Sequence, residues 1–166
     1  MDRLARRAVG LSPVVLSAGI LLFRPVAGDL EVLLGHMGGP FWARRDDGAW
    51  SMPKGEHGPD EDPRDAAARE FAEELGSPVP SGPLVELGTV RQPSGKRLTA
   101  FAVAADFDAG DIHSNTFELE WPRGSGRIRS FPEIDRAAWF DTATARHKLV
   151  RGQVEFVDRL LARASG

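Results

Sequence analysis

The chain has 166 residues, enough for one domain that buries about 70% of the surface its unfolded chain would expose. Its formal net charge of −3 excludes a general attraction to nucleic acid, so a bound polyphosphate would need a local cluster of cations or a metal ion. The absence of cysteine excludes disulfides, thiolate zinc sites and a cysteine nucleophile, and it suits a reducing, cytoplasmic compartment. We therefore predict a single domain over residues 1–166, with residues 1–12 as a flexible N-terminal segment and with no nucleic-acid partner.

The first predicted element is a β-strand at residues 14–23, an apolar run that follows a basic start. These are also the ingredients of a secretory signal, but no small-residue cleavage site follows, and the run is too short to span a bilayer. We therefore expect it to form the first strand of the fold, and we expect no membrane association. A second buried strand is predicted at residues 31–36, after a turn at residues 25–29.

The next predicted element is a helix bounded by Asp62 and Gly76. Asp62 offers a side-chain acceptor to the free amides of the first turn, and the following Pro63 needs no donor there. Gly76 can take a left-handed C-terminal conformation at little cost. The apolar residues of this helix form one stripe, which we expect to face the core: Ala68, Phe71, Ala72 and Leu75.

Three carboxylates lie on the helix side opposite this stripe, at Glu70, Glu73 and Glu74. Glu70 and Glu74 are one turn apart, about 6 Å along the axis, so their oxygens can converge on one cation. The helix alone is equally consistent with a solvated acidic face. The residues of the preceding loop therefore decide whether this face is a cation site or a solvated acidic surface.

Beyond the helix, the pattern predicts a β-hairpin of residues 84–92 and 97–106. Further strands are predicted at residues 116–121 and 138–140. Asp141 is the predicted N-cap of a helix that ends at Leu149, and a last helix is predicted at residues 153–161. Together these elements favour a mixed sheet between helices.

Seven residues of the loop and the helix follow the pattern Gly55-x5-Glu61-x7-Arg69-Glu70-x2-Glu73-Glu74-x-Gly76. This pattern resembles the Nudix box, the signature of hydrolases that act on nucleoside diphosphates linked to another group. The segment before it resembles the lead-in of several Nudix subgroups, including dinucleoside polyphosphate hydrolases: Trp50-Ser51-Met52-Pro53-Lys54-Gly55. Ser77 departs from the aliphatic residue usual in the family, and Val79 is the candidate to fill that space. The resemblance implies an α/β fold, a Nudix-type α/β/α sandwich with a central mixed β-sheet.

The resemblance also implies a magnesium site, with Mn²⁺ as a substitute. By that resemblance the ligands are the carbonyl of Gly55 and the carboxylates of Glu70, Glu73 and Glu74. Magnesium prefers oxygen ligands, lowers the pKa of a bound water and offsets the charge of a pyrophosphate. We therefore expect this loop and helix to form a metal site for phosphate chemistry.

A general base must deprotonate the attacking water, and Glu70 is the first candidate. Three later carboxylates stay open as alternatives: Glu118, Glu120 and Glu133. In the family, the arginine at the position of Arg69 holds a carboxylate in place through fork-like hydrogen bonds. Glu61 is expected to brace the loop or to be an outer-sphere ligand of the metal ion rather than to act as the base.

Lys54 is expected to place its ammonium group against a phosphate as charge develops there. Other cations could extend a basic rim: Arg44, Arg45, Arg91, Lys96 and Arg97. The aromatic residues that could stack on a nucleobase are Phe41, Trp42, Trp50 and Trp121. The chain has no tyrosine, so a tyrosine clamp on the base is excluded.

These features predict a magnesium-dependent pyrophosphohydrolase that attacks phosphorus with an activated water. The expected partner is a small-molecule nucleoside polyphosphate, either a nucleoside triphosphate or a dinucleoside polyphosphate. Hydrolysis of diphosphoinositol polyphosphates, nucleotide sugars or capped RNA stays open, although the net negative charge weighs against RNA. A Nudix-like nucleotide sensor that does not turn its ligand over also stays open. Homodimers are common in the family, so a homodimer stays open, although no surface patch in the sequence indicates one.

Overall fold

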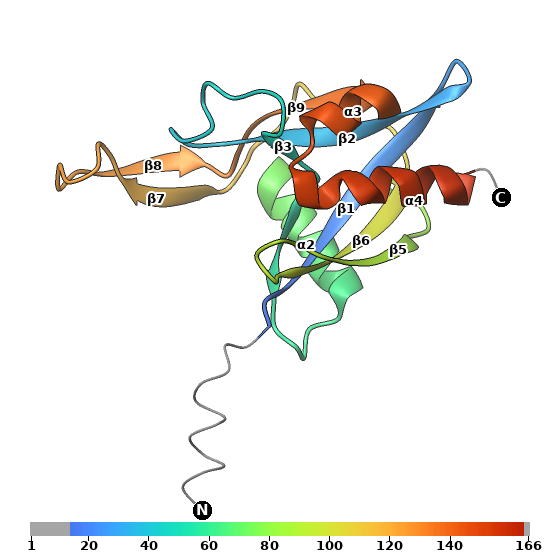
Figure 1. Cartoon of the computed structure of the whole chain (residues 1–166), viewed down its shortest axis with the longest axis horizontal. Coiled ribbons are helices and arrows are strands. Elements are labelled where there is room, and N and C mark those ends of the chain that lie inside the picture. Colours follow the sequence, from blue (N-terminus) through green and yellow to red (C-terminus); the bar gives the residue numbers. More distant parts are fainter. Residues whose placement is uncertain (1–13, 165–166) are drawn as a thin grey trace, which may run out of the picture.

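The computed structural model describes residues 14–164, which form two β-sheets with helices on both faces of the larger sheet (Figure 1). The strands are β1 Leu16–Val26, β2 Asp29–Met37, β3 Trp50–Ser51, β4 Lys54–His57, β5 Val85–Arg91, β6 Arg97–Ala104, β7 Thr116–Glu120, β8 Ile128–Pro132 and β9 Ile134–Asp141. The helices are α2 Pro63–Leu75, α3 Thr142–Lys148, the 3₁₀ turn η1 Arg151–Gln153 and α4 Val154–Ala164. The predicted segment 1–12 lies outside the described residues.

The larger sheet has seven strands, and β1 lies at its centre. β1 pairs with β6 in parallel along most of its length, and its other neighbours are antiparallel. On its second edge β1 changes partner, because its first half pairs with β4 and its last residues pair with β2. The predicted mixed sheet between helices is therefore confirmed, and the change of partner brings β4 to the centre of the fold.

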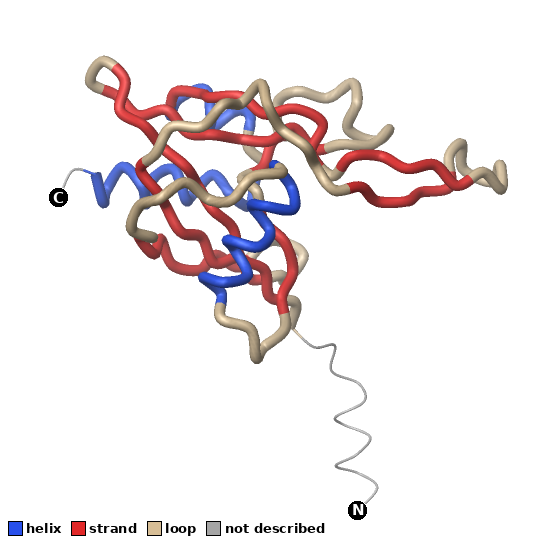
Figure 2. Tube along the Cα trace, turned by 180° about the vertical axis from the view of Figure 1, so that it is seen from behind, coloured by secondary structure: helices blue, strands red, loops and turns tan. Residues whose placement is uncertain are grey.

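The hydrophobic core has two layers, one on each face of this sheet. Side chains of β1, β2 and β6 on one face pack against α3 and α4, including Phe156 and Leu160. Those on the other face pack against α2, including Phe71 and Leu75. Val79 is partly buried and packs against this second layer. Figure 2 shows α2 running across the back of the sheet.

β7 and β8 form a separate two-stranded sheet that projects from the body as an arm (Figures 1 and 2). The strand predicted at residues 116–121 therefore exists, but it does not join the central sheet, and its partner β8 was not predicted. At the base of the arm the Glu133 N–H donates to the Asn115 carbonyl at 2.9 Å. This base places residues 115 and 133 next to the main sheet.

The predicted boundaries of α2 are confirmed. The Asp62 carboxylate accepts a hydrogen bond from the Arg64 N–H, and Gly76 adopts the left-handed conformation with φ 81°. The predicted apolar stripe is partly wrong, because Ala66 and Ala67 are fully buried whereas Ala68 and Ala72 are only partly buried. The helix contacts β4 as well as β1, so its buried face is wider than a single stripe.

The remaining elements follow the predicted order, with longer strands than expected near the C-terminus. β9 covers eight residues where three were predicted, because it pairs along most of β2. Asp141 caps α3 as predicted, through a 2.7 Å hydrogen bond from the Thr144 N–H. Within residues 14–164 no helix is both long and apolar enough to cross a bilayer.

Candidate active site

A polar cavity of about 400 Å³ lies where β1, β4, α2 and the base of the arm meet. It is lined by Ser17, Lys54, Gly55, Glu56, Glu70, Glu73, Glu74, Lys96, Asn115 and Glu133. The structure therefore brings together Lys54 and all four predicted metal ligands. Arg69 does not line the cavity, but it binds two carboxylates that do.

The first close contact in the cavity is between Gly55 and Glu70. A Cβ atom on Gly55 would overlap the carboxylate of Glu70, so this carboxylate occupies the space that a side chain at residue 55 would need. The antiparallel register of β4 on β1, which aligns Gly55 with Ala18, holds the backbone of Gly55 in this position. The observed position of the Glu70 carboxylate therefore depends on the absence of a side chain at residue 55.

Glu74 is nearly buried, with 5% of its surface exposed, which corrects the prediction that it lies on a face away from the core. Its Oε1 accepts a hydrogen bond from the backbone N–H of Lys54 at 2.9 Å. Burial raises the pKa of Glu74 to about 7, although that hydrogen bond and the Lys54 ammonium group both act to lower it. One carboxylate of the site therefore changes charge near neutral pH.

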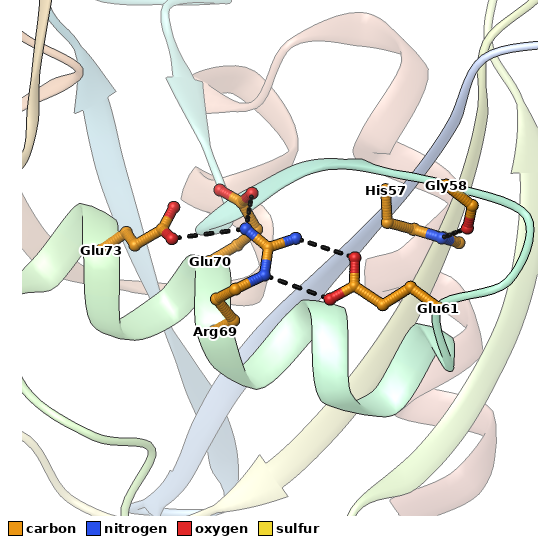
Figure 3. A network of polar contacts seen from close by, with 6 residues as sticks. All are labelled: His57, Gly58, Glu61, Arg69, Glu70 and Glu73. Carbon is orange, nitrogen blue, oxygen red and sulfur yellow. Dashed lines mark hydrogen bonds and ion pairs between the residues drawn. The ribbon is translucent and has the colours of Figure 1, made fainter.

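Arg69 links three carboxylates, as Figure 3 shows. Its Nε and Nη2 donate to the two oxygens of Glu61 at 3.1 and 3.0 Å, which is the fork-like arrangement expected of an arginine. Its Nη1 donates to Glu70 at 2.9 Å and to Glu73 at 3.3 Å. The fork is thus made with the loop residue Glu61, and this pairing ties the loop to the helix that carries the other two carboxylates.

The pKa of Glu70 is raised, first because the carboxyl group is partly buried and next because the Glu73 carboxylate lies nearby. The hydrogen bonds that Arg69 donates to the Glu61 carboxylate raise the pKa of Arg69, so its guanidinium stays charged. The site therefore combines one permanent cation with two carboxylates that accept protons more readily than an exposed glutamate does.

The chemistry of this donor set fits a hard divalent cation, because the acidic side chains and the Gly55 carbonyl offer oxygen atoms only. Within residues 14–164, no group of three or more acidic or histidine side chains is already placed to hold a metal ion. Arg69 pairs with Oε1 of Glu70 and with Oε1 of Glu73, and it makes no bond to Oε2 of either carboxylate.

The three carboxylates that were alternative candidates for the base differ in their distance from the cavity. Glu133, at the base of the arm, lines the cavity. Glu118 and Glu120 lie on β7 and are not among the lining residues, and Glu120 accepts a hydrogen bond from the Gly126 N–H at the tip of the arm. Glu133 is thus the one of the three that lies near the predicted ligands.

The predicted rim cations and the aromatic residues expected to stack on a nucleobase differ in whether they reach the cavity. Lys96 lines the cavity and pairs with Glu56 at 3.1 Å, whereas the rim arginines do not line it. No aromatic candidate lines it either, because Trp50 is buried against His36 and Phe140, and Phe41 packs on Trp121. Sequence reasoning missed Ser17, Glu56 and Asn115, which no local motif marks.

A mixed sheet between helices, with a carboxylate-lined cavity beside one helix, agrees with the phosphoanhydride hydrolases to which the sequence motif pointed. Residues 14–160 match the NUDIX domain family. A search of curated proteins gave no significant match.

Several solved structures share the fold at low sequence identity. A C. elegans Ap4A hydrolase binary complex is 22% identical with a TM-score of 0.61, covering 92% of this chain and 99% of that one. The NUDIX domain of Shewanella oneidensis NrtR complexed with ADP ribose is 17% identical with a TM-score of 0.62, covering 96% and 97%. A mutT/nudix family protein from Listeria innocua is 18% identical with a TM-score of 0.62, covering 93% and 96%. Because the family match covers residues 14–160, the chain belongs to the Nudix family.

Proposed function

We propose that this Nudix-family protein is a magnesium-dependent pyrophosphohydrolase whose substrate is a nucleoside triphosphate or a dinucleoside polyphosphate. The observation that carries the proposal is the lining of one cavity by five glutamates and two lysines. A polyphosphate needs cations around its oxygens, and the lysines alone cannot offset both its charge and that of the glutamates. A substrate of this charge therefore requires a metal ion at the carboxylates.

The residues that would hold the ion are Gly55, through its carbonyl, and Glu70, Glu73 and Glu74. A bound Mg²⁺ supplies charge neutralisation at the phosphate oxygens and a water of lowered pKa. Mn²⁺ is the expected substitute, because it accepts the same oxygen ligands.

Glu70 is the proposed base that takes the proton from the attacking water. Its raised pKa brings it closer to neutral pH, where a base is most effective. Glu133 is the alternative, since it lines the same cavity. Arg69 positions Glu70 through the hydrogen bond from Nη1, and Glu61 fixes the guanidinium on its other side.

Lys54 is proposed to neutralise charge on the phosphate during attack. Its ammonium group acts to lower the pKa values of Glu70 and Glu74, so it lies close enough to interact with both. Lys96 lines the same cavity and extends this role.

Two relatives with the same fold support a nucleotide substrate. One is named as an Ap4A hydrolase and the other was crystallised with ADP ribose. Ap4A and ADP ribose are both compounds in which a phosphate chain is attached to a nucleoside. A cytoplasmic location, supported by the lack of cysteine, and a homodimer stay predictions of the same account.

The test is a substrate panel of nucleoside triphosphates, dinucleoside polyphosphates, nucleotide sugars and diphosphoinositol polyphosphates, with Mg²⁺ and with EDTA. Hydrolysis of the substrate that the panel selects in ¹⁸O-labelled water then locates the attacked phosphorus by mass analysis of the products. We expect turnover of a nucleoside polyphosphate that EDTA abolishes. Nucleotide binding without hydrolysis of any panel member would favour a sensor and would contradict the proposal.

A further inference from the structure

Glu56 is a carboxylate of the catalytic cavity to which the proposed mechanism gives no role. The other four glutamates of the lining are the proposed metal ligands or the candidate bases: Glu70, Glu73, Glu74 and Glu133. Within residues 14–164, the Glu56 side chain makes one polar contact, an ion pair of 3.1 Å from its Oε1 to Nζ of Lys96. Lys96 lines the same cavity, so Glu56 neutralises a cation that a phosphate chain would otherwise meet.

The strand register places Glu56 between the two lysines of the cavity. Along β1, Lys54 lies beside residue 19, Glu56 lies beside residue 17, and Lys96 comes just before the residue that pairs with residue 16. Lys54 and Glu56 are two residues apart on β4, about 7 Å between their Cα atoms, so their side chains point to the same face. A phosphate chain that begins at Lys54 therefore passes Glu56 before it reaches Lys96.

The ion pair bridges the two strands that flank the first half of β1. Glu56 is on β4, and Lys96 immediately precedes β6. Both of these strands pair with residues 16–19 of β1, so they lie on its opposite edges. Ser17 of β1 lines the same cavity. The Glu56–Lys96 pair therefore crosses β1 within the cavity.

The backbone of Lys96 is fixed, whereas its ammonium group can change partner. The Gln92 N–H donates to the Lys96 carbonyl at 2.7 Å, and the following Arg97 N–H donates to the Val15 carbonyl at 2.9 Å. The ion pair itself is partly exposed, with 31% of the Lys96 side chain and 65% of the Glu56 side chain accessible to solvent. A pair this exposed contributes little to stability, so a phosphate oxygen can replace the Glu56 carboxylate at Lys96.

The two ends of the cavity differ in charge once a metal ion is bound. At the α2 carboxylates, the divalent ion and the Arg69 guanidinium offset the negative charge. At the other end, Lys96 and Glu56 cancel each other. A phosphate that reaches Lys96 displaces the Glu56 carboxylate, and two like charges then lie close together. Glu56 therefore weakens the binding of distal phosphates more than that of phosphates at the metal site.

We infer that Glu56 is a specificity-determining residue that restricts the cavity to short phosphate chains, because it withholds Lys96 from the distal phosphates of a longer chain. Repulsion against an unwanted ligand is a general means of specificity. The preferred substrate is then a nucleoside triphosphate rather than a dinucleoside polyphosphate with a longer chain. This inference rests on the proposed function, since it chooses between the two substrates proposed there.

Binding of inorganic phosphate chains tests this inference without turnover, because pyrophosphate, tripolyphosphate and tetrapolyphosphate lack the nucleoside of the proposed substrate. Calorimetric titrations with Mg²⁺ at physiological ionic strength are made on the wild type, Glu56→Gln, Lys96→Gln and the double variant. The matched control is Glu86→Gln, because Glu86 is exposed, lies on β5 of the same sheet and does not line the cavity. Circular dichroism and melting temperature establish that each variant is folded, and phosphate analysis establishes that the chains stay intact.

We expect the Kd for tetrapolyphosphate to fall at least about threefold in Glu56→Gln, and the Kd for pyrophosphate to change less than about 1.5-fold. In the Lys96→Gln background, Glu56→Gln should change the Kd for tetrapolyphosphate less than about 1.5-fold, because no cation is left there for the chain to gain. Glu86→Gln should bind all three chains like the wild type. In turnover, the ratio of kcat/KM for diadenosine tetraphosphate to that for ATP should rise at least about threefold in Glu56→Gln.

Three results would overturn the role of Glu56: no fall in the Kd for tetrapolyphosphate in folded Glu56→Gln, an equal fall for pyrophosphate, or an equal fall with and without Lys96. An ion pair that only ties the β5–β6 turn to β4 would give the first result, and general repulsion by the cavity would give the other two. The substrate panel distinguishes this failure from failure of the proposed function. Hydrolysis of a nucleoside polyphosphate with no effect of Glu56→Gln rejects only the role of Glu56, whereas the length-selective gain in binding without hydrolysis rejects only the catalytic proposal.

Discussion

The carboxylate of Glu70 occupies the space in which a side chain at Gly55 would lie. Gly55 is on β4 and Glu70 is on α2, so this contact sets the distance between the strand and the helix across the catalytic cavity. The glycine is followed by another at residue 58, where an added Cβ atom would meet nothing within 4 Å. The two glycines therefore provide a matched comparison.

We predict that Gly55→Ala folds but loses at least about tenfold in kcat, because the new methyl group displaces the flexible end of Glu70 and leaves the backbone in place. Gly58→Ala is the control and should keep wild-type activity. Steady-state kinetics with thermal melting of both variants make the comparison. Wild-type kcat in Gly55→Ala would contradict the role given to this contact.

We predict that Glu70→Gln and Glu74→Gln each lower turnover at least about tenfold without loss of the fold, because each removes a negative charge from the proposed metal site. Glu118→Gln is the control, since Glu118 lies on the arm away from the cavity. If turnover fell as much in Glu118→Gln as in the other two variants, the loss would not be specific to the cavity, and the prediction would be contradicted. Glu133→Gln, assayed beside Glu70→Gln, shows which of the two residues is the base.

Arg69→Lys is predicted to lower kcat at least about tenfold while the melting temperature stays near that of the wild type. A lysine keeps the charge but cannot make the paired bonds to Glu61 together with the bond to Glu70. The guanidinium is partly exposed, so its pairs contribute little to stability. Arg127→Lys, on the arm, is the control. Normal turnover in Arg69→Lys would show that a positive charge alone is sufficient.

The raised pKa of Glu74 predicts how the stability of the metal-free protein depends on pH. The folded protein holds this proton up to about pH 7, whereas the unfolded chain releases it near the ordinary value of 4.5. The stabilisation from this proton is therefore complete below pH 4.5, and it is lost as pH rises through about 7. A glutamine at residue 74 does not titrate, so Glu74→Gln lacks this contribution to the pH dependence of stability.

Urea denaturation in EDTA measures this effect. At pH 8 we expect Glu74→Gln to be more stable than the wild type by on the order of 1–3 kcal/mol, and at pH 4.5 we expect the two to be similar. The comparison isolates Glu74, because every other titrating group is present in both proteins. A constant difference between pH 4.5 and pH 8 would mean that the Glu74 carboxyl is not stabilised in its protonated form.

The sequence was sufficient to predict those parts of the site that depend only on residues close together in the chain. Asp62 and Gly76 set the ends of α2 through their own backbone and side-chain chemistry, so the spacing of the glutamates followed directly. The burial of Glu74 was not predictable in this way, because it depends on β4 packing against a second side of the helix. Lys96 and Asn115 reach the cavity only through long-range strand pairing and through the base of the arm.

The central claim is that the α2 carboxylates gather a divalent ion in the cavity, and Mn²⁺ binding followed by electron paramagnetic resonance tests it most directly. We predict a saturable Mn²⁺ site in the metal-free wild type that is retained in Glu118→Gln and weakened at least about tenfold in both Glu70→Gln and Glu74→Gln. Equal Mn²⁺ affinity in all four proteins would contradict the account.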